Sequence, residues 1–184
     1  MLIGEADVLH AVADAVRQLQ RLGIGYDDLF SPMTDEAMDA ALRRLTIRAS
    51  GHALGTGPDA PLELVTPPLY GRYLLLWSTD VDADRRRFAL RHGMGHVAAG
   101  HVTAPRFLTA DGDWMSADER VADLFALADL VPFHQVAALR KGGSWRAVRA
   151  EVAALVRMHT HAWPAERVDD RTVMRVTLYR ELAL

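Results

Sequence analysis

The chain has 184 residues, a formal net charge of -3 and no cysteine. This length suits about one domain with a sizeable core, and the lack of cysteine excludes disulfide scaffolds, cysteine-ligated zinc and a cysteine nucleophile. The negative charge argues against non-specific nucleic-acid binding, and no apolar run reaches the roughly 18 residues of a membrane span. Because the N-terminus also lacks the basic region of a signal peptide, we expect a cytoplasmic protein.

Two helices are predicted in the N-terminal part of the chain. Residues 5–22 carry apolar side chains at helical spacing, and Gly23 suits the position that ends such a helix. Thr34 is a candidate N-cap for a second helix, with acidic residues in its first turn. We therefore assign residues 5–48 to N-terminal helices and residues 50–61, which are rich in glycine and proline, to a loop.

A small sheet is predicted next. Residues 62–65 suit a short strand, and residues 72–77, with the sequence RYLLLW, form a continuous apolar run typical of a buried strand. The following helix is expected to begin at Asp80 or Asp82 and to extend to about Gly100. These elements predict an α+β fold that is mainly helical, with a small β-sheet, in a single domain.

Helices are expected to dominate the remainder of the chain. Ser116 is the candidate N-cap of a helix over residues 117–130, and Ser116 and Glu119 have the spacing of a capping box. Residues 133–184 are assigned to C-terminal helices, although the last segment, 171–184, suits a strand equally well.

Two histidines lie four residues apart in the third predicted helix, within the sequence HGMGH. Side chains at this spacing share one helix face, with Cβ atoms about 5–6 Å apart, so His92 and His96 can direct imidazole nitrogens at one ion. Neutral imidazole is a common zinc ligand. Taken alone the pair is weak evidence, because many helices contain two histidines that only pack.

Two carboxylates, Glu119 and Asp123, lie four residues apart on the next predicted helix. Glu119 can complete a set of two histidines and one glutamate, which is the ligand set of thermolysin-like catalytic zinc sites. Asp123, one turn further, can accept the other ring N–H of a ligand histidine and fix its tautomer. In the alternative interpretation, Glu119 folds back onto its own helix end as a capping-box residue and Asp123 is solvated.

These motifs, in this order, resemble the ImmA/IrrE family of zinc metallopeptidases. The similar stretches are RYLLLW, RFALRHGMGHVAAGH and ERVADLFALADLVP, and they span residues 72–132, about a third of the chain. The matching positions include Gly95, His101, Ala122, Asp123, Phe125, Ala126 and Pro132. The resemblance implies a zincin-like metallopeptidase domain over residues 1–184, with residues 72–132 as its motif core.

The resemblance also implies which residues form the site. The implied ligands of one zinc ion are His92, His96 and Glu119. Asp123 is implied as the carboxylate behind a ligand histidine. RYLLLW is implied as the strand that borders the cleft and pairs with substrate, which makes the candidate substrate-binding residues Leu74, Leu75 and Leu76.

The function that the resemblance implies is site-specific cleavage of a protein partner. In this family the partner is often a helix-turn-helix transcriptional repressor. No direct contact with nucleic acid or with a membrane is expected.

One position departs from the family pattern. Where these peptidases carry a glutamate after the first histidine, this chain has Gly93. In the family that glutamate polarises the zinc-bound water and carries its proton to the leaving amine, and such acid–base catalysis is typically worth about 10²–10⁴-fold in rate. Glycine has no side chain for either step, so we expect peptidase activity to be absent or strongly reduced.

Three explanations for Gly93 are open. The protein is a natural pseudoenzyme that keeps its metal, or it is an altered form of an active HEMGH enzyme, or another group acts as the base, for which His101 and His134 are candidates. A non-catalytic module that binds a protein partner through the old cleft is the alternative function. The remaining hypothesis is a helical protein whose histidines only pack.

Overall fold

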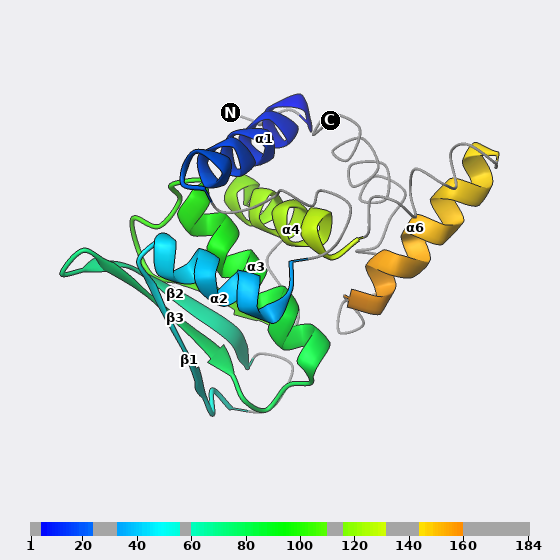
Figure 1. Ribbon diagram of the computed structural model, residues 1–184. Helices are drawn as coiled ribbons and strands as arrows, with labels where there is room; N and C mark the ends of the chain where they lie inside the picture. Colours follow the sequence, from blue (N-terminus) through cyan, green and yellow to red (C-terminus); the bar gives the residue numbers. More distant parts are fainter. Residues whose placement is uncertain (1–4, 24–32, 56–59, 110–115, 132–143, 160–184) are drawn as a thin grey trace.

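The computed structural model describes residues 5–23, 33–55, 60–109, 116–131 and 144–159 (Figure 1). The helices are α1 (Glu5–Arg21), α2 (Asp35–Arg44), α3 (Ala83–Ala98), α4 (Ala117–Leu130) and α6 (Trp145–His159). The strands are β1 (Ile47–His52), β2 (Pro61–Leu69), β3 (Arg72–Ser78) and β4 (Arg106–Thr109). The described part of the chain is therefore an α+β structure, as the sequence predicts.

The four strands form one mixed sheet in the order β1-β3-β2-β4. β1 is parallel to β3, and β2 is antiparallel to both β3 and β4. Residues that pair across strands share a face, so the pairs Glu63–Trp77 and Val65–Leu75 point to the same side of the sheet. α3 packs against β2 and β3 on that side, and α4 packs against α3 (Figure 1).

The caps that the sequence predicts begin the helices in the structure. The Thr34 hydroxyl accepts a hydrogen bond from the Ala37 N–H at 3.2 Å and starts α2. Of the two candidates for α3, Asp82 is the cap, and its carboxylate accepts from the Arg85 N–H at 2.9 Å. Gly23, just beyond α1, has the positive φ of 64° that a helix-ending glycine adopts.

The sheet is larger than the sequence predicts. β1 occupies the end of the segment assigned to helices and the start of the assigned loop. Its sequence, IRASGH, has no apolar alternation, and its backbone is held as a strand by parallel pairing with β3. β2 extends beyond residues 62–65 through two prolines, and its register with β3 shifts there, as expected where N–H donors are missing. β4 was not predicted. Of the C-terminal helices, α6 is described, whereas residues 133–143 and the segment 171–184 lie outside the described residues.

Two contacts bring α3 and α4 together. A Cβ built on Gly95 would lie 3.1 Å from Phe125 Cδ1 and 3.2 Å from Ala122 Cα, so the glycine allows the close approach of the helices. Arg91 and Asp129, both about 2% exposed in their side chains, form a buried ion pair between α3 and α4. Among the described helices none is long and apolar enough to cross a membrane.

Candidate metal centre

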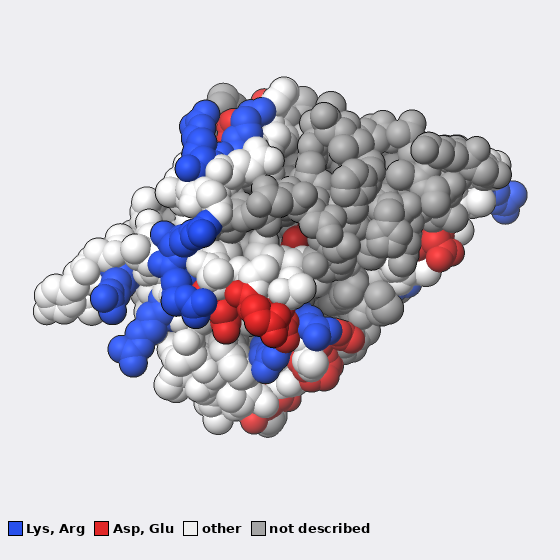
Figure 2. Space-filling model, in the orientation of Figure 1, with Lys and Arg blue, Asp and Glu red and all other residues white. Residues whose placement is uncertain are grey.

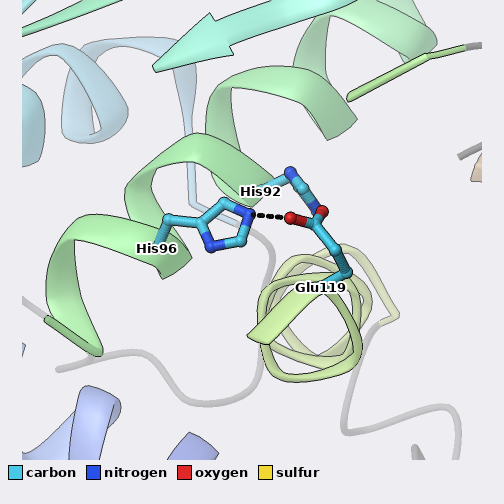
Figure 3. A group of neighbouring side chains, drawn as sticks. All are labelled: His92, His96 and Glu119. Carbon is cyan, nitrogen blue, oxygen red and sulfur yellow. Dashed lines mark ion pairs between the residues drawn. The ribbon is translucent and has the colours of Figure 1, made fainter. Parts of the chain in front are cut away.

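Three predicted ligands meet where α3 faces the start of α4. His92 and His96 lie one turn apart on α3, and Glu119 lies in the first turn of α4, pointing toward both imidazoles (Figure 3). The residues are 1%, 0% and 6% exposed, respectively. The fold therefore collects two imidazoles and a carboxylate from sequence-distant positions into one buried cluster.

The distances within this cluster suit one metal ion. Glu119 Oε2 lies 3.3 Å from His92 Nε2, and Glu119 Oε1 lies 3.3 Å from His96 Nε2. One ligand atom from each residue lies within 4.8 Å of those from the other two. Ligand atoms about 2.0–2.1 Å from a tetrahedral zinc ion are about 3.3–3.4 Å apart, so small adjustments would accommodate the ion.

The capping-box alternative for Glu119 is only half realised. The Ser116 hydroxyl accepts a hydrogen bond from the Glu119 backbone N–H at 3.1 Å, which caps α4. Among the described residues, the Glu119 side chain does not accept from the Ser116 backbone N–H, as a capping box requires, and instead faces the two histidines. One residue thus takes part in the cap through its backbone and in the cluster through its carboxylate.

Glu63, a residue that the sequence analysis does not single out, lies behind His92. It is 1% exposed on β2, and its Oε1 lies 3.0 Å from His92 Nδ1. Its Oε2 accepts the Gly93 backbone N–H at 3.2 Å. In the sequence, Glu63 could have been identified as the one carboxylate within the apolar strand segment LELV, because a buried charge there needs a buried partner.

Asp123 was expected at the ring nitrogen of a ligand histidine that does not bind the ion, but it lies beside the other one. Its Oδ1 is 3.3 Å from His92 Nε2, the nitrogen that faces Glu119. The position behind the ring, at Nδ1, is taken by Glu63. In the structure, Asp123 therefore belongs to the side of His92 on which an ion would bind.

The electrostatics of the cluster favour a positive charge. Burial by itself lowers the pKa of His92, but the carboxylates of Glu63, Glu119 and Asp123 outweigh it and hold that pKa well above its usual range. Burial acts to raise the pKa of Glu119, but the two imidazoles beside it hold that pKa well below its usual range. A bound metal cation would be stabilised by the same carboxylates.

Several buried atoms of the cluster lack a well-aligned hydrogen bond within the described residues. They are Nε2 of His92, both ring nitrogens of His96 and Oε2 of Glu119. A buried polar atom without a partner costs about 1–3 kcal/mol. Coordination by an ion at the two Nε2 atoms and the carboxylate would remove most of this cost, so these residues fit a metal.

Gly93 faces the sheet. A Cβ at this position would lie 2.5 Å from Leu75 Cδ1 and 3.2 Å from Glu63 Oε1. Leu75 is fully buried, so it has little room to move away. A glutamate at position 93 would meet the sheet and the Glu63 carboxylate at its first side-chain atom.

Polar residues flank the cluster near the end of α3. The His101 ring centroid lies 5.8 Å from that of His96, and burial lowers the His101 pKa. Arg106 donates to Asp118 at 2.7 Å, and its Nη1 lies 3.8 Å from Glu119 Oε1. His134, the other candidate base, lies outside the described residues.

The expectation that residues 74–76 border a cleft does not fit the topology. β3 lies between β1 and β2 and pairs with both, so its backbone is not available to a substrate strand. Leu75 is buried under α3, whereas Leu74 and Leu76 alternate onto the opposite face of the sheet and are half-buried. The apolar run correctly indicates a buried strand. An interior strand has no free edge at which a substrate could pair.

A hollow in the described part of the chain lies away from the cluster. It has a volume of about 640 Å³ between α2 and β1, and Arg43, Arg48 and Arg72 are among its lining residues. Figure 2 shows arginines gathered where α2 meets the sheet. The elements that form this hollow carry none of the candidate metal ligands.

Comparison with protein-family models, with curated proteins and with solved structures gives no match for the chain. The case for a metal centre rests on the geometry of the chain's own residues.

Proposed function

We propose that the protein binds one zinc ion through His92, His96 and Glu119, and that it is a metallopeptidase-like protein of the ImmA/IrrE type that lacks the general base. The observation that carries the proposal is the buried cluster of two imidazoles and one carboxylate, with contacts of 3.3 Å and unsatisfied nitrogens. Bound zinc would supply a Lewis acid that polarises a carbonyl or an attached water.

The chain's own groups supply the rest of the site. Glu119 bridges the two helices, and Asp123 adds a carboxylate beside His92. Position 93 has no side chain and faces Leu75, so it contributes no proton acceptor. The proposed role is therefore that of a pseudopeptidase, which holds its metal and recognises a protein partner, possessing little or no hydrolytic activity.

Recognition of a protein partner without catalysis is the second candidate function. It is favoured by the open face of the sheet, where Leu64, Leu74 and Leu76 are half-buried and the neighbouring Phe107 is 55% exposed. Clustered apolar side chains on a surface are typical of interaction sites. The partner proposed from the family resemblance is a helix-turn-helix repressor.

Metal analysis tests the zinc proposal. After zinc loading and desalting, the parent protein should retain one equivalent of zinc, because two imidazoles and a carboxylate converge on one position. Glu119→Gln should lose most of it, since the amide keeps the shape but removes the charge.

The matched control is Glu36→Gln, which changes an exposed glutamate in the first turn of α2 and should leave the zinc content unchanged. Retention of less than about a tenth of an equivalent by the parent protein would contradict the proposed set of two histidines and one glutamate as zinc ligands.

A further inference from the structure

Glu63 is a buried carboxylate whose described partners belong to α3. It is 1% exposed and lies on the face of β2 that packs against that helix. Burying a carboxylate is costly unless it is paired and hydrogen-bonded. Its partners, His92 Nδ1 at 3.0 Å and the Gly93 N–H at 3.2 Å, indicate that its role concerns the histidine.

The contact determines which nitrogen of His92 is available to an ion. When Nδ1 carries the proton and donates to Glu63 Oε1, Nε2 has the free lone pair. Nε2 is the atom that lies 3.3 Å from both Glu119 and Asp123. A carboxylate behind the ring thus aims the opposite nitrogen at the cluster, an arrangement that raises ligand basicity.

Gly93 makes room for this carboxylate. A Cβ at position 93 would lie 3.2 Å from Glu63 Oε1. Without that Cβ, the Glu63 carboxylate can approach α3 closely enough to accept a hydrogen bond from the Gly93 backbone N–H. The absence of a side chain on α3 and the presence of a buried glutamate on β2 are therefore two parts of one arrangement.

We propose that Glu63 is a positioning residue of the metal centre, which fixes the tautomer of His92, and that Gly93 is required to admit it. This inference rests on the proposed zinc function. It assigns to β2 a carboxylate that orients a ligand and that does not itself touch the ion.

Zinc affinity, measured by competition with a chromogenic chelator, tests this role. Glu63→Gln should weaken zinc binding by about 10- to 100-fold, because the amide lacks the charge and presents an NH₂ donor to the Gly93 N–H or to Nδ1. Leu62→Ala is the control for general damage to β2. Leu62 is the buried apolar neighbour of Glu63 on β2 and offers no polar group to the cluster, so this variant should lose stability but keep its zinc affinity within about threefold.

Nitrogen-15 NMR of the histidine rings in the zinc-loaded parent protein tests the geometry directly. His92 should show a protonated Nδ1 and a metal-bound Nε2. Metal at Nδ1, or an affinity of Glu63→Gln within threefold of the parent, overturns the role of Glu63 and leaves the zinc site standing. A parent protein that takes up no zinc overturns both proposals.

Discussion

A side chain at position 93 would compete with Glu63 for one small space between α3 and the sheet. The Glu63 carboxylate fills it and accepts the Gly93 N–H, while Leu75 closes it from the side. Gly93→Glu would therefore place a second carboxylate beside the first and is not a simple restoration of a peptidase. The single residue that the sequence marks as a missing base is, in the structure, a packing requirement.

The packing at Gly93 can be measured with a double-mutant cycle. Gly93→Ala should lower the free energy of unfolding by about 1 kcal/mol, because a helix gain of about 1 kcal/mol is outweighed by an overpacking cost of about 1–3 kcal/mol. In a Leu75→Ala background the contact at 2.5 Å is absent and the contact with Glu63 Oε1 at 3.2 Å remains, so the same change should destabilise the protein clearly less. Urea denaturation measures both values, and an equal destabilisation in the two backgrounds would rule out Leu75 as the cause.

The elements α2, α3 and α4 are joined by one buried polar connection. Arg91 on α3 pairs with Asp129 on α4 and donates to the Met33 carbonyl at 2.6 Å. Asp129 also accepts the Met33 N–H at 3.2 Å. Because Met33 directly precedes the cap of α2, this connection fixes the start of that helix against the two helices that carry His92, His96 and Glu119.

Breaking this connection should be strongly destabilising. Asp129→Ala leaves the Arg91 guanidinium buried without its counter-charge, and we expect the free energy of unfolding to fall by about 3–5 kcal/mol. Asp84→Ala, which removes the partially exposed ion pair with Arg87, should cost less than about 1 kcal/mol. Chemical denaturation compares the two variants, and similar losses would contradict the structural role of the buried pair.

For the molecule as a whole, a bound ion would connect three layers. His92 and His96 belong to α3, Glu119 to α4, and Glu63 attaches the cluster to the sheet. An ion that binds only the folded arrangement adds directly to the stability of the whole structure. Metal content and global stability should therefore change together.

Chelation provides the test at this scale. At free zinc about 1,000 times above its Kd, binding stabilises the fold by about 4 kcal/mol, which for a chain of this size raises the melting temperature by roughly 8–16 °C. A chelator should remove this increment from the parent protein and have no effect on the His92→Ala, His96→Ala double variant. If the parent protein melts at the same temperature with and without chelator, the histidines only pack.

Local patterns predicted much of the helical framework. Thr34, Asp82 and Ser116 cap their helices as expected, because a cap depends on a few neighbouring residues. β1 and β4 were missed, since their short sequences have no apolar alternation and their strand conformation depends on partners distant in the chain. β3 was recognised as a strand, but its place in the sheet depends on strand order, which no local pattern contains.

The sequence by itself determined the spacing of His92 and His96, the candidate ligand Glu119 and the absence of a side chain at position 93, because each depends on residue type and helical period. Only the tertiary structure decided which nitrogen of His92 faces Asp123, that Glu63 stands behind the ring, and that Gly93 turns toward the sheet. These are relations between β2, α3 and α4, and they are set by how the helices pack on the sheet.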